Sequence, residues 1–333
     1  MIKSLSSLRF VFAILVFFVH IGQLHVAIGH AFFIVLSGFI LTYVYEERIL
    51  SGKINFKEFF KKRLLRIYPL HILTLLIAIP LSLEGFFENT LSWLGKFFLN
   101  LFFLQTFVPN NFVYFSFNGV AWNAADLVIF YFLFFFLVFL FSKLNLKLFT
   151  ILILFIILFI CVSMAVVPEK YYHYVFYISP FFRIFDFIFG MYLYKLTQKI
   201  TFKNNYFTAS LLEILVLVFL ALWFGFANYH VELLKPYLYS VYLWLPLSLV
   251  IIVFYYQRGV ISKKVLSSKV MLSLGGISYS FYMIHQLVIR YSEPLIEAVP
   301  HIVYYYIFCF VVSVLLAYVS FNYFENIFYR KKK

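Results

Sequence analysis

The stretch LRFVFAILVFFVH, residues 8–20, decides the fold, because it is an apolar run that contains an arginine and ends in a histidine. A second apolar run, AFFIVLSGF, follows at residues 31–39. On a helix, Arg9 and His20 are separated by about 1,100° of rotation and about 16 Å of rise, so both face the same way. A charge facing hydrocarbon costs several kcal/mol, which predicts an inward-facing, functional position. The alternative is that Arg9 reaches the headgroups and His20 is an ordinary core residue.

The composition places the whole chain in a membrane. Of its 333 residues, 65% are hydrophobic and 12% are charged, and the mean hydropathy is +0.97. These values predict an all-α polytopic bundle, a single integral-membrane domain over residues 1–333 without a fused soluble domain. The net charge of +14 does not indicate nucleic-acid binding, since the basic residues occupy short loops between apolar spans. Cys161 and Cys309 lie in apolar runs, so neither a metal site nor a disulfide is expected.

Ten apolar stretches are each near the roughly 20 residues that a bilayer requires. They are residues 5–26, 31–46, 67–84, 121–142, 147–167, 174–195, 207–227, 237–256, 270–291 and 302–325. An eleventh stretch, residues 93–108, carries Lys96, Asn100 and Gln105 and ends at Pro109. We therefore expect this stretch to be re-entrant or to lie at the outer interface.

The loop charges predict the orientation. With a cytoplasmic N-terminus, ten spans place five basic groups on the inner side: residues 48–66, Lys143 with Lys147, Lys195 to Lys203, Arg258 to Lys269 and Arg330 to Lys333. The outer loops then hold only Lys96, Lys170 and Lys235. Because basic residues accumulate in cytoplasmic loops, this asymmetry predicts that both termini are cytoplasmic.

A second basic element, FFKKRLLRIYP at residues 59–69, stands at the predicted cytoplasmic entrance to the third span. Arg63 and Arg66 are three residues apart, so they share one helical face, and their guanidinium groups could donate hydrogen bonds to phosphate oxygens. For the neighbouring lysines we prefer positive-inside anchoring.

With these elements, the chain resembles the acyltransferase-3 family, the membrane O-acyltransferases that modify bacterial surface glycans. The resemblance rests on an arginine, ten residues and a histidine at positions 9–20, on FFIVLSGF at 32–39 and on RLLRIYP at 63–69. Further similar elements follow in the family's order: Asn100 with Gln105 and Pro109, Arg183 and Asp186 with Gly190, residues 276–280 with Tyr282 and His285, and Ser320 with Glu325. Together they cover nearly the whole chain.

One element departs from the family's pattern. Where the family typically has Trp-Ser-x-x-x-Glu, this chain has Trp122 followed by Asn123, and Leu127 stands at the Glu position. The only nearby carboxylate, Asp126, is one residue early and about 100° round a helix. Two readings stay open: Asp126 acts from a shifted register, or the step that needs the carboxylate is impaired.

Acyl transfer from a thioester to a hydroxyl needs a base and a group that stabilises the oxyanion. His20 is the best candidate base because imidazole titrates near neutral pH. The resemblance implies that Arg63 and Arg66 bind the phosphates of acyl-coenzyme A and that Arg9 meets the pantetheine end or the developing charge. The alternative is a covalent acyl-enzyme on His20 or Ser37, although the Leu-Ser-Gly run more simply lets helices approach closely.

The remaining candidates have structural alternatives. Arg183 and Asp186 can pair with each other, and His285 could line an acceptor cavity or bond a neighbouring helix. Arg290 is expected to be solvated near the outer surface, and His25, His30 and His71 stay unassigned. The catalytic residues that we expect are His20, Arg9 and Asp126. The expected substrate-binding residues are Arg63, Arg66, Ser37, Asn100, Gln105, Trp122, Arg183, Asp186, Tyr282 and His285.

The resemblance therefore implies an O-acyltransferase of the bacterial inner membrane. It would move an acyl group, expected to be acetyl, from cytoplasmic acyl-coenzyme A to a hydroxyl of a saccharide or lipid-linked glycan, without a tightly bound cofactor and alongside glycan-assembly partners. The alternatives are a glycan exporter or flippase without acyl transfer, and a catalytically degraded scaffold.

Overall fold

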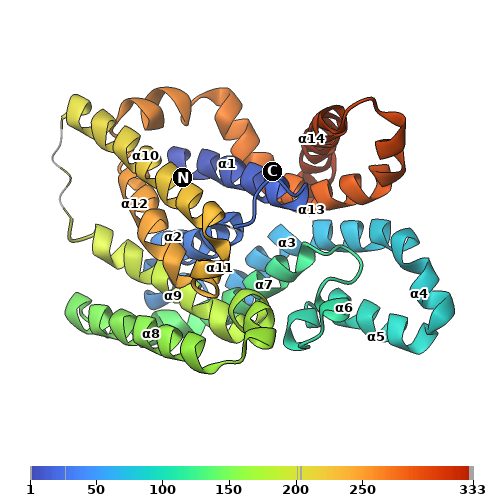
Figure 1. The fold of residues 1–333 in the computed structure, drawn as a ribbon. Coiled ribbons are helices and arrows are strands. Elements are labelled where there is room, and N and C mark those ends of the chain that lie inside the picture. Colours follow the sequence, from blue (N-terminus) through green and yellow to red (C-terminus); the bar gives the residue numbers. More distant parts are fainter. Residues whose placement is uncertain (1, 27, 201, 203–204, 330–333) are drawn as a thin grey trace. The chain divides into compact units, whose positions relative to one another are not determined.

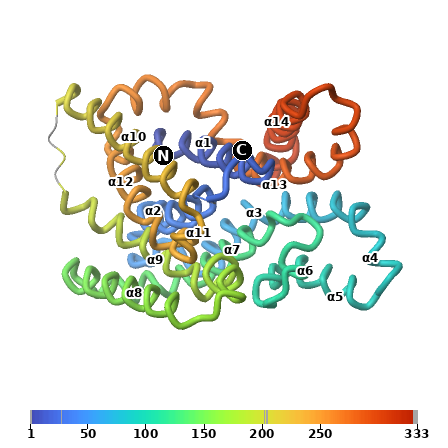
Figure 2. The backbone as a smooth tube through the Cα atoms, in the orientation of Figure 1, coloured from blue at the N-terminus to red at the C-terminus, as the bar shows by residue number. Residues whose placement is uncertain are grey.

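The computed structural model describes residues 2–26, 28–200, 202 and 205–329, and within these residues every regular element is a helix (Figure 1). The backbone trace in Figure 2 follows the same succession of helices. The predicted all-α fold class is confirmed. Lys203 and the tail from Arg330 to Lys333, which belong to the charge argument, lie outside the described residues.

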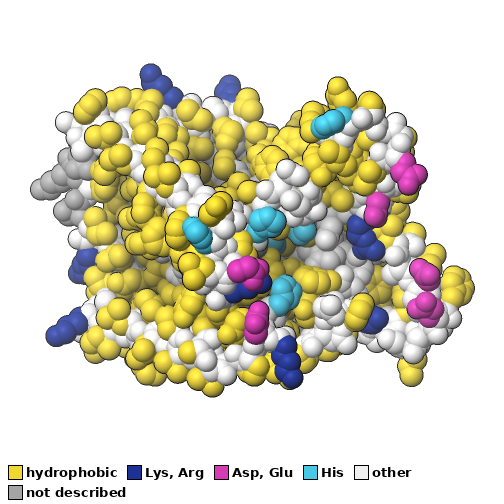
Figure 3. Space-filling model, viewed as in Figure 1, with side chains coloured by type: hydrophobic (Ala, Val, Ile, Leu, Met, Phe, Trp, Pro, Cys, Tyr) yellow, Lys and Arg dark blue, Asp and Glu magenta, His cyan; other side chains and the backbone are white. Residues whose placement is uncertain are grey.

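Six of the described helices are long and apolar enough to cross a membrane by themselves. They are α1 (Lys3–His20), α2 (Ile28–Leu50), α7 (Ala121–Ser142), α8 (Leu146–Val166), α10 (Tyr206–Tyr229) and α14 (Ile302–Val319), whose helical run continues to Phe328. On the face shown in Figure 3, hydrophobic side chains cover most of the surface and charged ones are sparse. The chain is therefore a multi-pass membrane protein.

Two bent pairs of helices raise the number of spans to as many as eight. The helix α3 (Phe56–Ala78) and the helical residues Pro80–Glu88 meet at 54°, and Glu169–Ile178 and α9 (Pro180–Thr197) meet at 46°. In both pairs a proline opens the second piece. Proline lacks the backbone N–H that would bond the preceding turn and suits the first helical position, so both second pieces begin at a proline.

The count of ten spans stays a prediction. The predicted span 237–256 contains α12 (Trp244–Tyr255), which has only 12 residues, and α13 (Lys269–Ser292) carries Ser, Tyr, His and Gln side chains that lower its hydropathy. The predicted eleventh stretch contains α5 (Thr90–Leu101), again only 12 residues long. A bilayer needs about 20, so α5 is too short to cross it.

Contacts divide the chain into two compact units, which are described separately. The first unit comprises Met1–Phe56, Phe130–Tyr177 and Phe181–Gly276, and the second comprises Lys57–Ile129, Ile178–Pro180 and Ile277–Lys333. In the first unit, α1, α2 and α12 pack against one another and α10 packs on α12. The second unit has an apolar core around Leu75, Phe117 and Leu287. The prediction of one membrane domain over the whole chain stays a prediction.

Small residues let α2 and α9 approach closely in the first unit. A Cβ atom on Gly38 would overlap the carbonyl oxygen of Phe187, and one on Gly190 would overlap that of Val35. Gly38 follows Ser37 in the Leu-Ser-Gly run, so the run serves close helix packing whatever else Ser37 does.

Hydrogen bonds and an ion pair in the first unit join helix ends that the charge argument places on the same side. On the predicted inner side, the Lys3 amide donates to Gln257 Oε1 at 2.9 Å, and Lys195 Nζ lies 2.5 Å from a Glu46 carboxylate oxygen. At the opposite helix ends, the His25 amide donates to Asn228 Oδ1 at 2.8 Å. The alternation of helix directions in this unit thus agrees with the predicted topology.

The second unit shows the same agreement at its predicted outer end. The Arg290 guanidinium donates to the carbonyl oxygens of Phe117 at 2.5 Å and Leu81 at 3.4 Å, and the Tyr291 hydroxyl donates to that of Ile77 at 2.5 Å. Arg290, which we expected to be solvated near the outer surface, is half-buried and also hydrogen-bonded. Its side chain satisfies carbonyl groups where two chain segments leave their helices, and helix interiors provide no such partners.

Candidate functional site

Arg9 and His20 both lie on α1 and both are half-buried. His20 is the last residue of this helix, and the chain turns immediately afterwards at Gly22, whose φ of +74° favours glycine. The sequence predicted an apolar span continuing to residue 26, so the helix ends earlier than expected. As a result, the His20 side chain stands at a helix terminus, with its ring hydrogen-bonded to the backbone of Val16.

A second imidazole, His30, lies beside His20 and contacts a phenol, Tyr177. The ring of His30, near the start of α2, is 6.2 Å from the His20 ring in an edge-to-face arrangement. The Tyr177 hydroxyl lies 3.0 Å from His30 Nδ1, and both side chains are largely buried. Sequence reasoning left His30 unassigned. The available signal was the short connection between two apolar runs, which predicts antiparallel neighbours and brings residues 20 and 30 to the same end.

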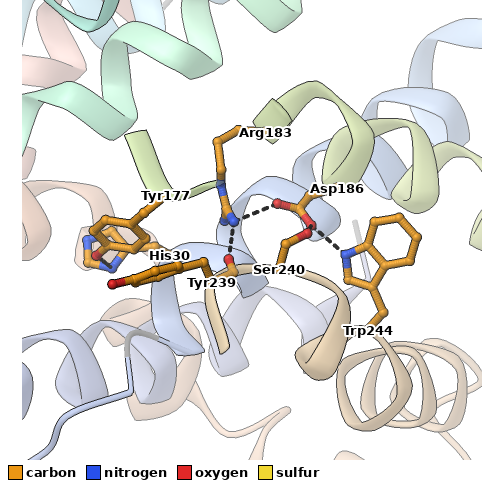
Figure 4. A network of polar contacts seen from close by, with 7 residues as sticks. All are labelled: His30, Tyr177, Arg183, Asp186, Tyr239, Ser240 and Trp244. Atoms are coloured by element: carbon orange, nitrogen blue, oxygen red, sulfur yellow. Dashed lines mark hydrogen bonds and ion pairs between the residues drawn. The ribbon is translucent and has the colours of Figure 1, made fainter. Parts of the chain in front are cut away.

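Arg183 and Asp186 form the centre of a buried polar network (Figure 4). Both project from α9, three residues apart, with Arg183 Nη1 2.8 Å from Asp186 Oδ2 and no solvent exposure on either side chain. The other carboxylate oxygen, Oδ1, accepts hydrogen bonds from Ser240 Oγ at 2.7 Å and from Trp244 Nε1. Arg183 Nη1 also donates to the carbonyl oxygen of Tyr239. The network therefore keeps a fully buried ion pair in a low-dielectric interior, where a single charge would be costly.

Aromatic side chains stand on the other side of Arg183 in the same view (Figure 4). The rings of Tyr177 and Tyr239 are 5.3 Å apart, and Tyr177 also bonds His30. In the part of the chain that the structure describes, Arg183 Nε and Nη2 have no hydrogen-bond partner. The arrangement can therefore offer N–H donors and aromatic faces next to the His20–His30 pair.

A pocket of about 460 Å³ opens in the first unit near the end of α10. Its lining residues are His25, Asn228, Tyr229, His230, Val231, Glu232 and Leu233. Asn228 Oδ1 accepts the amide of His25, which ties the loop after His20 to this pocket. Glu232 also bonds Lys235 Nζ at 2.8 Å, which raises the pKa of that ammonium group. The volume lies within the about 300–1,000 Å³ of typical ligand sites.

In the second unit, Arg63 and Arg66 are both half-buried and lie near the start of α3. The helix runs through them and through Pro69 to Ala78, whereas the predicted span began only at residue 67. Three residues apart on a continuous helix, the two guanidinium groups share a face, as the sequence predicted.

Residues 122–127, the element that departs from the family's pattern, form the first turns of α7. Trp122 and Asp126 are four residues apart and therefore share a face, and both are buried, whereas Leu127 is half-buried. The carboxylate that faces the interior is thus Asp126 itself. Both readings of the element stay predictions.

On α13, Tyr282 and His285 are both buried. The Tyr282 hydroxyl donates to the Val120 carbonyl oxygen at 2.7 Å, and His285 Nδ1 lies 3.1 Å from the Phe281 carbonyl oxygen one turn earlier. Tyr282 therefore fixes the segment before α7 to α13.

Asn100 and Gln105 differ in their bonding. Asn100 Nδ2 donates to Ser116 Oγ at 2.8 Å, while among the described residues nothing hydrogen-bonds either amide atom of the fully buried Gln105. Sequence reasoning left His71 unassigned. Its Nε2 atom is 2.8 Å from the Asn100 carbonyl oxygen, and its ring stacks on Phe103 at 4.1 Å.

The candidate residues thus fall into two groups. The first unit holds Arg9, His20, Ser37, Arg183 and Asp186, and the second holds Arg63, Arg66, Asn100, Gln105, Trp122, Asp126, Tyr282 and His285. The structure joins Arg183 directly to Asp186. It adds His30, Tyr177, Ser240 and Trp244 as neighbours that no short motif marks.

Comparison with known proteins gives one family. A family model described as an acyltransferase domain matches residues 2–321, which is almost the whole chain and includes every candidate residue. No curated protein and no solved structure matches the chain.

Proposed function

Because this chain belongs to the acyltransferase-3 family, we propose that it transfers an acyl group from cytoplasmic acyl-coenzyme A to a hydroxyl of a cell-surface or lipid-linked saccharide. The acyl group that we propose is acetyl, with coenzyme A as a substrate and not a bound cofactor. The membrane is the bacterial inner membrane, with both termini cytoplasmic and glycan-assembly proteins as partners.

The observation that carries this proposal is the end of α1. His20 stands at a helix terminus, half-buried, with the buried His30 6.2 Å away and Tyr177 bonded to His30. A base must be held in a fixed orientation, within reach of the hydroxyl proton that it takes. The hydrogen bond to the Val16 backbone and the neighbouring His30 ring support such an orientation for the His20 imidazole.

In the proposed reaction, His20 takes the proton of the acceptor hydroxyl while the hydroxyl oxygen attacks the thioester carbonyl carbon. The carbon–sulfur bond then breaks, the acyl group stays on the acceptor oxygen, and the proton passes to the departing thiolate of coenzyme A. Arg9 is proposed to stabilise negative charge on the donor. Asp126 is proposed to supply the carboxylate of the element that begins at Trp122. A preorganised cation in a low-dielectric site stabilises developing charge more than one in water.

The donor phosphates are assigned to Arg63 and Arg66. Their common face on α3 and their position at the predicted cytoplasmic end support this role, since paired guanidinium groups suit phosphate oxygens. The lysines beside them are exposed and are expected to act as anchors.

The acceptor is assigned to the first unit. Two nitrogen atoms of Arg183, Nε and Nη2, and the rings of Tyr177 and Tyr239 offer the hydrogen bonds and flat apolar surfaces that a sugar ring uses. The pocket near α10 lies at the predicted outer ends of its helices, and we propose it as the entry for the acceptor. His25 lines it and is five residues from His20, a span of at most about 18 Å.

The test is acyl-coenzyme A binding and thioester turnover by the purified protein in nanodiscs. His20→Ala is expected to abolish turnover and keep donor binding, whereas Arg66→Ala is expected to weaken binding. Lys62→Ala, which removes an exposed charge from the same helix, is the matched control and is expected to change neither. If the folded wild-type protein binds no acyl-coenzyme A, the proposal fails.

Export of a glycan without acyl transfer is the second candidate, and the observation that favours it is Leu127 at the family's Glu position. Export in cells separates the two functions. An exporter would keep moving glycan after His20→Ala, whereas the acyltransferase would leave the glycan present but unacylated.

A further inference from the structure

Several side chains of the second unit carry buried polar atoms, and five of these side chains are amides or an imidazole whose open atoms have no hydrogen-bond partner among the described residues. The atoms are His71 Nδ1, both amide atoms of Gln105 and of Asn123, Asn118 Oδ1 and Gln286 Oε1. We call these five residues the amide cluster. Buried polar groups in native proteins are nearly always hydrogen-bonded, so several such atoms in one unit indicate water or a ligand that binds there.

One half of the amide cluster lies where the segment before α7 packs on α13. Asn118 Nδ2 donates to the Met283 carbonyl oxygen at 2.9 Å. The Gln286 amide lies against Gly119, where a Cβ atom would be 2.8 Å from Gln286 Oε1. Asn123 follows in the first turn of α7. The absence of a side chain at Gly119 therefore leaves room for an amide at this point.

The other half is connected to the first through hydrogen bonds. His71 Nε2 bonds the Asn100 carbonyl oxygen, and Asn100 Nδ2 donates to Ser116 Oγ, two residues before Asn118. Gln105 follows Phe103, whose ring stacks on His71. The amide cluster therefore belongs to one packed region of the second unit.

The helix α3 carries both the arginine pair and His71 of the amide cluster. His71 follows Arg66 by five residues and Arg63 by eight, which corresponds to about 7.5 Å and about 12 Å along the axis. His71 is also about 140° around the helix from Arg66 and about 80° from Arg63, so a ligand that binds both the arginine pair and the amide cluster would extend along α3 and partly around it.

The chemistry of the amide cluster is neutral. Its open atoms are amide N–H donors, amide oxygen acceptors and one imidazole nitrogen, and the buried Asp126 carboxylate follows Asn123 by three residues on α7. Such atoms match a ligand portion that is itself rich in amides. The pantetheine arm of acyl-coenzyme A has two amide groups, with the diphosphate at one end and the thioester at the other.

We infer that the amide cluster binds the pantetheine arm of the acyl donor. This inference rests on the proposed donor and adds the residues that guide its neutral portion. Arg63 and Arg66 hold the phosphates, and the amide cluster pairs with the two amides of the arm, which extends the thioester into the protein.

Binding of two ligands tests the inference: acetyl-coenzyme A, and S-acetylpantetheine, which lacks the phosphates. Gln105→Met and Asn123→Leu remove the amides at nearly constant volume. Each is expected to weaken both ligands about tenfold, or about 1.4 kcal/mol, by calorimetry on the full chain in nanodiscs. Arg66→Ala is expected to weaken acetyl-coenzyme A alone. Asn322→Leu, at an exposed position of the second unit, is the control and is expected to change neither ligand.

The outcomes separate the two proposals. If acetyl-coenzyme A binds the wild type and both amide variants equally, the amide cluster holds only water and the inference is overturned while the proposed function stands. A loss confined to acetyl-coenzyme A in the amide variants also overturns it, because the arm is common to both ligands. No binding by the wild type sinks the proposed donor. Should one amide variant fail to fold, the other decides.

Discussion

Removing the Asp186 charge by Asp186→Asn is expected to lower the free energy of unfolding by about 3–5 kcal/mol. The magnitude follows from complete burial of both partners: Arg183 keeps its charge but loses the carboxylate 2.8 Å away. An amide can accept from Ser240 or Trp244 through its oxygen, but its NH₂ group faces the guanidinium N–H groups with the same polarity.

The double variant Arg183→Met with Asp186→Leu is expected to recover most of this loss. Replacing a buried ion pair by apolar side chains of similar size is often neutral, because neither charge then needs solvation. The measurement is the free energy of unfolding in mixed micelles for the wild type, Arg183→Met, Asp186→Leu and the double variant, which yields the coupling between the two sites.

The control is the exposed pair of Lys235 with Glu232. Lys235→Ala is expected to cause no measurable change, because exposed ion pairs contribute little. The reasoning is refuted if Asp186→Asn changes stability no more than Lys235→Ala, or if the double variant is less stable than either single one.

Three further predictions concern packing and turnover. Gly38→Ala is expected to lower the free energy of unfolding by about 1–3 kcal/mol, because its Cβ would overlap a backbone oxygen of α9. The control Gly225→Ala, which has open space around it, is expected to be neutral or stabilising. Equal effects of the two substitutions would contradict the close packing of α2 on α9. Tyr177→Phe removes the 3.0 Å hydrogen bond to His30 and is expected to lower kcat about tenfold (about 1.4 kcal/mol) with unchanged coenzyme A binding. An unaltered kcat would exclude a catalytic role of the Tyr177–His30 hydrogen bond. Asp126→Asn is expected to lower thioester turnover at least about tenfold, and Leu127→Glu in that background should not restore it, because position 127 is half-buried and off the Trp122 face. If neither substitution alters turnover, the element is dispensable.

Sequence alone determined the features that depend on local spacing. The apolar runs predicted helices and a membrane, because backbone hydrogen bonding in lipid leaves few other structures. The i,i+3 spacing of Arg183 and Asp186 predicted their pairing, since residues three apart are neighbours on one helix. The family motifs placed the candidate residues in order along the chain, and the matched family covers the same residues.

Only the tertiary structure decided which distant side chains complete the site. Tyr177 bonds His30 from 147 residues away, and Ser240 bonds Asp186 from 54 residues away. A polar residue in an apolar run reads the same in the sequence whether it is paired, as Asp186 is, or has open buried atoms, as Gln105 has. Pairing depends on how helices pack, because a hydrogen bond needs partners within about 3 Å and a helix rotation of one residue moves a side chain by about 100°. Local periodicity fixes the helix, whereas packing between helices fixes the partner.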